Sequence, residues 1–285
     1  MKQLQKILVP VDINSEYQKQ IEVAVKLADI FKSEIILMYV VPADDLNEDV
    51  KDIIIRSVTE TLHEIRKIFL SNNIKVKDTV ISFGNIVETI IQKGNLERVN
   101  LIFLGARNKK INEKYHLGVI SEQIIQKSEV PVCVIKLDGK NLVTNILCPV
   151  DFSEPSGRAL NNAILLAKKF EAALHILTVY EPILSVSGWI HVDLDEENAK
   201  RLERVQNEML AFISQFDLEG VNYKIEVKTG NIEELILTSI DSHHIDLLIM
   251  GTHGRTGLSH FIMGSVTKKV TREMPCSFIT MKPNT

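Results

Sequence analysis

The sequence is poor in cysteine and in aromatic residues. Its 285 residues include three cysteines, and the aromatic residues make up 6% of the chain. Cys133, Cys148 and Cys276 occur singly, with no C-x-x-C pair, so nothing indicates a disulfide framework or a cysteine-rich metal site. Each lies in an apolar, strand-like run. We therefore expect all three to be buried as small hydrophobic side chains in a reducing compartment.

Concentrated charge and long hydrophobic runs are also missing. The formal net charge is -4, and no basic, aromatic-rich patch occurs, which argues against general binding to nucleic-acid backbones. No apolar run approaches the roughly 20 residues of a membrane span. The apolar segment at 7–12 is too short for a signal peptide and ends in an aspartate. We expect a cytoplasmic protein without nucleic-acid or membrane partners.

What is present suits a globular protein of two domains. The chain is 45% hydrophobic and 25% charged, and its length allows two domains of ordinary size, each with its own core.

The two halves repeat the same landmarks in the same order. Four segments recur at offsets of 139 to 146 residues, namely 7–12 at 146–151, 83–88 at 229–234, 101–105 at 247–251 and 130–136 at 274–280. Chance similarity would not keep its order over four landmarks, so this is a duplication at the scale of a domain. A polar stretch at 138–141 marks the join, and we expect domains at 1–139 and 140–285.

Within each half, apolar strands alternate with helical patterns. We expect strands at 6–11, 34–41, 76–82, 100–105, 132–136, 145–150, 173–179, 222–228, 245–250 and 276–281. In the first half we expect helices at 18–31, 49–72 and 84–93 and one more before the fifth strand. In the second half we expect helices at 155–170 and 195–216 and two that begin at 231 and 264. Such alternation predicts an α/β fold with two five-stranded, Rossmann-like parallel sheets covered on both faces. Ligands of such sheets bind beyond the carboxyl ends of the strands.

The most distinctive stretch is a glycine-bearing loop at 250–265, between an apolar strand and a helix. Gly251 is followed after two residues by Gly254, and after nine more by Gly264 and Ser265. Glycines let the backbone approach a ligand closely, and the N-terminus of a helix attracts phosphate. The loop is neither a Walker A motif nor G-x-G-x-x-G. The alternative is a simple strand-to-helix turn whose glycines satisfy local geometry.

This spacing, together with the opening Ile-Leu-Cys-Pro-Val-Asp at 146–151 and the closing Val-Pro at 130–131, resembles the universal stress protein family. The resemblance covers nearly the whole chain. It implies an adenine nucleotide alpha hydrolase-like fold, with the two fifth strands paired about a pseudo-twofold axis. It also implies ATP in the second half, with Mg²⁺, AMP and ADP left open. The residues it assigns to the nucleotide are Pro149, Asp151, Val179, Gly251, Gly254, Gly264, Ser265 and Val266.

The resemblance gives several of these residues a part. Gly254, Gly264 and Ser265 would contact phosphates, Asp151 the nucleoside, and the Val179 backbone the adenine. Each has a structural alternative: Asp151 with Ser153 could cap the following helix, Val179 could be a strand end, and Ser265 could be an N-cap.

The first half departs from the pattern. Asn108 replaces the glycine equivalent to Gly254, and Val119 follows Gly118 where the second half has Ser265. An asparagine side chain would crowd a phosphate, and a valine offers it no hydroxyl. We expect only the second domain to bind ATP well.

Other candidate sites are weaker. His243 and His244 adjoin, with Asp241 and Asp246 near them, but adjacent residues of a strand point in opposite directions and make poor metal ligands. His253 and His260 lie in the glycine loop. The apolar connection at 183–190 could pack on its own domain, cover a nucleotide or meet a partner. None of these patterns indicates a catalytic residue.

We expect a nucleotide-dependent regulator or protective factor of the stress response, with an unidentified protein partner and an open possibility of a homodimer. Two alternatives remain: a slow ATPase or phosphotransferase, for which no P-loop lysine or metal-binding carboxylate is visible in the loop, and a ligand-free scaffold.

Overall fold

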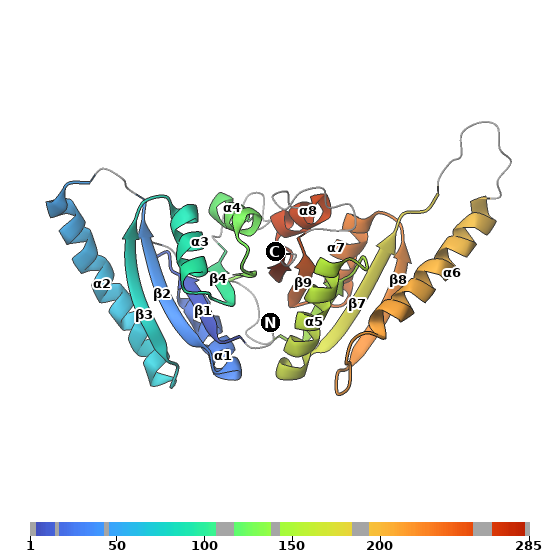
Figure 1. The fold of residues 1–285 in the computed structure, drawn as a ribbon, viewed down its shortest axis with the longest axis horizontal. Helices are drawn as coiled ribbons and strands as arrows, with labels where there is room; N and C mark the ends of the chain where they lie inside the picture. The colour runs from blue at the N-terminus through green and yellow to red at the C-terminus, as the bar shows by residue number, and fades with distance from the viewer. Residues whose placement is uncertain are drawn as a thin grey trace. The chain divides into compact units, whose positions relative to one another are not determined.

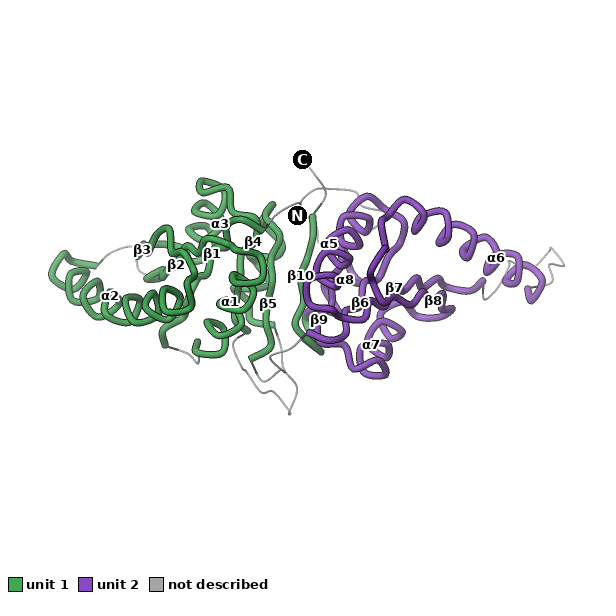
Figure 2. Tube along the Cα trace, turned by 90° about the horizontal axis from the view of Figure 1, so that it is seen from below, with its two compact units in different colours: residues 1–141, 272–282 green, residues 142–271, 283–285 purple. Residues whose placement is uncertain are grey.

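The computed structural model describes residues 4–14, 17–42, 46–106, 117–137, 143–183, 194–252 and 264–282. The chain divides into two compact units: residues 1–141 with 272–282, and residues 142–271 with 283–285. Figure 2 colours the two units separately. Among the helices of the described segments, none is long and apolar enough to cross a bilayer.

The first unit holds a mostly parallel sheet in the strand order β3-β2-β1-β4-β5-β10. Its strands are β1 (Lys6–Pro10), β2 (Glu34–Val41), β3 (Val76–Phe83), β4 (Leu101–Gly105), β5 (Val132–Ile135) and β10 (Ser277–Met281), and its helices are α1 (Gln18–Phe31), α2 (Glu48–Ser71), α3 (Ile86–Leu96) and α4 (Val119–Lys127). β1 lies between β2 and β4, so the strand order reverses there and creates a topological switch point.

The second unit repeats this plan in the order β9-β6-β7-β8. It contains β6 (Asn145–Pro149), α5 (Glu154–Phe170), β7 (Ala173–Tyr180), α6 (Leu194–Ile213), β8 (Tyr223–Thr229), α7 (Ile232–Ser242), β9 (Leu247–Gly251) and α8 (Ser265–Glu273), whose last two residues count with the first unit. Figure 1 shows α4 and α8 at the upper edges of the sheets. The predicted α/β class and element order are confirmed.

β10 pairs with β5, and this pair is antiparallel. Phe278 lies opposite Val134, and Ile279 opposite Cys133. The Lys136 amide donates to Ser277 Oγ at 3.1 Å. Figure 2 shows β10 in the colour of the first unit, beside β5. The predicted pairing of the two fifth strands is therefore present.

The predicted strand at 245–250 begins two residues late, at Leu247. Asp246 uses its side chain instead of continuing the strand: Oδ2 accepts hydrogen bonds from the Thr144 amide (2.8 Å), the Thr144 hydroxyl (2.8 Å) and the Asn145 amide (3.0 Å). These bonds fasten the start of β6 beside the start of β9. Local side-chain competition of this kind is invisible to hydrophobic periodicity.

The Gly-Asn pairs that open α3 and α7 act alike in both units. Gly84 and Gly230 have φ of 127° and 144°, which suits glycine alone. Asn85 and Asn231 then cap their helices through hydrogen bonds of 3.1 and 3.0 Å from amides three residues on. All three cysteines are buried, as predicted, and none forms a disulfide; burial raises the pKa of the Cys133 thiol to about 12.

Candidate functional site at the carboxyl edge of the second unit

Three strand ends of the second unit meet at one edge. Pro149 lies opposite Leu177 in the β6–β7 pair, so Asp151, two residues on, is level with Val179. In the β6–β9 pair Leu147 lies opposite Leu248, which places Gly251 level with Val150. The fold thus brings the predicted residues Pro149, Asp151, Val179 and Gly251 to one rim; we call it the second rim. Pro149, Asp151, Val179 and Gly251 are all partly accessible.

Gly264 closes the junction between β9 and α8. Its amide donates to the Thr252 carbonyl at 2.8 Å, and a Cβ at this position would lie 3.3 Å from the same oxygen. The Thr267 hydroxyl donates to the Gly251 carbonyl at 2.9 Å. A side chain at this position would be crowded, because the backbone returns closely to the strand end. Gly254 lies outside the described residues.

Ser265 is the first residue of α8, and Gly264 precedes it. The Lys268 amide donates to the Gly264 carbonyl at 2.9 Å, which is the first bond of the helix. Gly264 is therefore the N-cap, and the alternative that Ser265 is the N-cap is wrong. Ser265 is exposed and Val266 is partly buried. A serine at N1 keeps its hydroxyl beside the first-turn amides, which have no acceptor within the helix itself.

Asp151 supports the start of α5, as one alternative predicted. Its Oδ1 accepts from the Ser153 amide at 3.1 Å and from the Ser153 hydroxyl at 2.5 Å. Ser153 is the N-cap and accepts from the Ser156 amide at 3.4 Å. Phe152 between them has φ of 64° and its ring packs against Phe212. The turn is therefore held in one conformation from both sides.

The first unit has a different edge at the equivalent place. α4 begins at Val119 with Gly118 as its N-cap, so Val119 stands where α8 has Ser265. Val119 is 69% exposed. A Cβ at Gly118 would meet nothing within 4 Å, whereas a Cβ at Gly264 would meet the backbone. Asn108 lies outside the described residues.

A histidine pair that the sequence analysis missed lies at the other edge of the second unit. The rings of His175 on β7 and His243 after α7 stack with centroids 4.5 Å apart. His243 Nε2 lies 3.3 Å from Glu226 Oε2. Burial and His243 lower the pKa of His175. The available signal was a lone histidine in the apolar strand at 173–180.

This pair does not form a metal centre with its neighbours. His243 ends α7 rather than lying in a strand, and Asp246 is engaged at the start of β6. Over the described ranges, no group of three or more His, Cys, Asp or Glu side chains could hold a metal ion. His253, His260 and most of the apolar connection at 183–190 lie outside those ranges.

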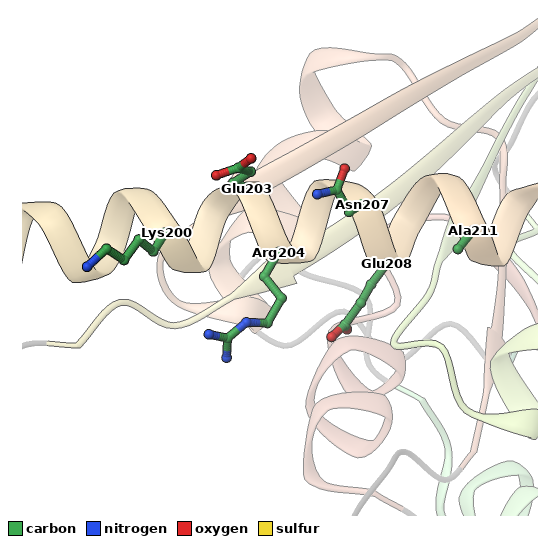
Figure 3. A pocket seen from close by; sticks show the side chains of 6 residues that line it. All are labelled: Lys200, Glu203, Arg204, Asn207, Glu208 and Ala211. Carbon is green, nitrogen blue, oxygen red and sulfur yellow. The ribbon is translucent and has the colours of Figure 1, made fainter.

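An open hollow runs along α6. Figure 3 shows that the side chains lining it all come from this one helix: Lys200, Glu203, Arg204, Asn207, Glu208 and Ala211. Lys200 forms ion pairs with Glu196 and Glu197 on the same helix, at 2.8 and 3.0 Å. The hollow is a solvated helix face and not part of the second rim.

Fold and site together define a tandem, mostly parallel α/β protein with a candidate ligand rim in its second half. The family model of universal stress proteins matches residues 3–136 and 143–282. The chain belongs to the universal stress protein family.

Individual relatives agree with this assignment. Universal stress protein MJ0531 of Methanocaldococcus jannaschii is 28% identical over 152 residues, covering 51% of this chain and 85% of the relative. Universal stress protein Slr1230 of Synechocystis is 26% identical over 184 residues, which cover 64% of this chain and 58% of the relative. A crystal structure of a universal stress protein from Archaeoglobus fulgidus has a TM-score of 0.72 at 23% identity, covering 99% and 100%. The last likeness supports the fold alone.

Proposed function

We propose that the second rim binds ATP and that the protein acts as a nucleotide-dependent regulator or protective factor under stress. The observation that carries this proposal is the junction at Gly264. There the Gly264 amide donates to the Thr252 carbonyl at 2.8 Å, so α8 begins beside the end of β9, and the strand registers bring Asp151 and Val179 to the same edge of the sheet. A Cβ at Gly264 would make a tight contact of 3.3 Å with the Thr252 carbonyl oxygen.

The chemistry of the rim suits a nucleotide. The free amides of a helix start and the Ser265 hydroxyl are donors for phosphate oxygens, and a carboxylate at Asp151 can accept from ribose hydroxyls. Mg²⁺ would be held mainly by the phosphates themselves, because magnesium retains several waters and needs few protein ligands. The three cysteines are buried and form no disulfide, which agrees with a reducing compartment, and we place this function in the cytoplasm.

The proposal includes a difference between the halves. Val119 presents methyl groups where Ser265 presents a hydroxyl, and Gly118 lacks the close backbone approach of Gly264. The first domain, at 1–139, is then a degenerate copy. ATP bound by the second domain, at 140–285, would control which partner the protein meets.

Calorimetric titration with ATP and Mg²⁺ tests this proposal. The wild-type chain should bind ATP, and Ser265→Ala should weaken binding about tenfold, because a hydrogen bond to a charged group contributes about 1.5 kcal/mol or more. Val119→Ala is the matched control at the same position of α4 and should leave affinity unchanged. Absence of binding by the wild-type chain, or equal effects of the two variants, would count against the proposal.

A further inference from the structure

We infer that the side chains of Tyr39 and Asn14 close the nucleoside side of the first unit's edge, independently of the changes in its glycine loop. The nucleoside side means the turn after a unit's first strand together with the end of its second strand. In the second unit these are the places of Asp151 and Val179. This inference rests on the proposed function, because it explains why one half would bind ATP and the other would not.

The turns after β1 and β6 begin identically. The Asn14 amide donates to Asp12 Oδ1 at 3.1 Å, and the Ser153 amide donates to Asp151 Oδ1 at 3.1 Å. The strand registers also match: Ile7 lies opposite Ile35 in the first unit, and Ile146 opposite Leu174 in the second. The backbones can therefore be compared residue by residue, at an offset of 139.

The side chains of the equivalent residues Asn14 and Ser153 then diverge. The Ser153 hydroxyl turns back into its own turn, donating to Asp151 at 2.5 Å and accepting from Ser156. The side-chain amide of Asn14 instead reaches out of its turn, and its Nδ2 donates to the Tyr39 hydroxyl at 3.3 Å. One turn is closed on itself, while the other is tied to the neighbouring strand.

Tyr39 has Thr178 as its counterpart. The Thr178 hydroxyl donates to the Val150 carbonyl at 2.6 Å and the side chain is 3% exposed, so it lies below the edge. Tyr39 is larger by a whole ring, is only partly buried, and reaches the turn after β1 with its hydroxyl. A base entering between the turn after β1 and the end of β2 would have to displace this ring and break the hydrogen bond to Asn14.

On the other side of β1, a second side chain ties strand ends of the first unit together. Gln20 of α1 is 3% exposed, and its Nε2 donates to the Pro10 carbonyl at 2.9 Å and to the Phe103 carbonyl at 3.0 Å. It bridges β1 and β4 at the topological switch point. The equivalent residue of α5 is Ala159, whose methyl group cannot make such a bridge.

The test counts ATP sites per chain by calorimetry in full-length variants. The loop variant carries Asn108→Gly and Val119→Ser, which restore the sequence pattern of the second half. The combined variant adds Asn14→Ser and Tyr39→Thr, the residues that the second half itself carries; Gln20 is kept, because its amide satisfies two carbonyls. We expect the loop variant to bind as many ATP molecules as wild type, and the combined variant to bind one more.

Two further variants sharpen the result. A combined variant that carries Tyr39→Phe in place of Tyr39→Thr keeps the aromatic ring, and it should bind no more ATP than wild type. A variant that adds only Tyr39→Ala to the loop variant removes the ring without changing Asn14, and it should also bind one more ATP than wild type. An additional site in the loop variant, or none in the combined and Tyr39→Ala variants, would overturn the inference. The wild-type count reports separately on the proposed function, since only the gain over wild type concerns Tyr39.

Discussion

Gly264 and Gly118 hold the same place at the start of the last helix in each half, and of the two only Gly264 has a neighbour that would crowd a Cβ. The Thr252 carbonyl lies 3.3 Å from where a Cβ of Gly264 would be, while the same position at Gly118 faces open space. The sequence shows both glycines equally, so it could not reveal this difference. The difference depends on how closely the chain returns to the strand end.

Gly264→Ala should therefore both destabilise the protein and weaken ATP binding. We expect Gly264→Ala to lower the free energy of unfolding by about 1 kcal/mol more than Gly118→Ala does, because the added methyl group crowds the junction. Gly118→Ala replaces the same N-cap residue and so corrects for the intrinsic preference of that position. Thermal melting followed by circular dichroism measures the first effect and ATP titration the second. Indistinguishable behaviour of the two variants would contradict the role given to Gly264.

Glu226 carries a pH dependence that can be measured. Burial opposes its ionisation, but hydrogen bonds from Lys224, Lys228 and His243 outweigh this and lower its pKa to about 2. A group with a lowered pKa stabilises the fold above its unfolded value of 4.5, and this contribution is lost as the pH falls toward about 2.

Glu226→Gln should accordingly lower the melting temperature at pH 6, and the difference from wild type should shrink as the pH falls from 4.5 toward 2. Glu203→Gln, on the exposed side of α6, is the control and should follow wild type throughout. A deficit of Glu226→Gln that stays constant down to pH 2 would show that its charge is not the cause.

Some residue-scale features could be predicted and others could not. The Gly-Asn helix starts at 84–85 and 230–231 follow from local backbone chemistry, and both have the predicted form. The stacking of His175 on His243 joins residues far apart in the sequence, so no local pattern announces it. Likewise the Tyr39–Asn14 contact depends on the register of β1 against β2.

At the scale of the element, β10 is bound to β5 by its backbone and by two side chains. Ser277 accepts from the Lys136 amide at 3.1 Å, and the Thr280 hydroxyl donates to the Val132 carbonyl at 3.4 Å. Without β10, the apolar edge of β5, which includes the buried residues Val132, Cys133 and Val134, would lose this cover. Exposed apolar edges invite pairing with another chain.

Deleting residues 277–285 should therefore lower the melting temperature and promote self-association relative to the wild-type chain. Deleting only 283–285, which follow β10, is the control and should change neither property. Melting curves and size-exclusion chromatography at several concentrations measure both. A truncated chain with the wild-type melting temperature and elution volume would contradict the importance given to this strand pair.

Element boundaries show where hydrophobic patterns stop being sufficient. The helix predicted at 18–31 is α1 residue for residue, and its apolar spacing puts Ile21, Ala24 and Ala28 in the core. The strand predicted at 245–250 starts late, because Asp246 serves β6 with its side chain. Periodicity identifies which residues are buried, but it cannot tell which partner a polar side chain selects at an element's end.

On the scale of the whole molecule, one α/β plan occurs twice with different edges. The duplication could be predicted from four recurring landmarks, and the family model matches both halves. The difference between the edges of the two halves could be predicted in part from Val119 and Asn108. The contribution inferred for Tyr39 and Asn14 could not, because each is an ordinary residue until the fold places it at the strand ends.

The number of ATP molecules bound per wild-type chain tests the central claim most directly. Titration calorimetry with ATP and Mg²⁺ should give one site, assigned to the second half by its loss of affinity in Ser265→Ala. Two equal sites would contradict the asymmetry between the halves, and no measurable binding would contradict the nucleotide function itself.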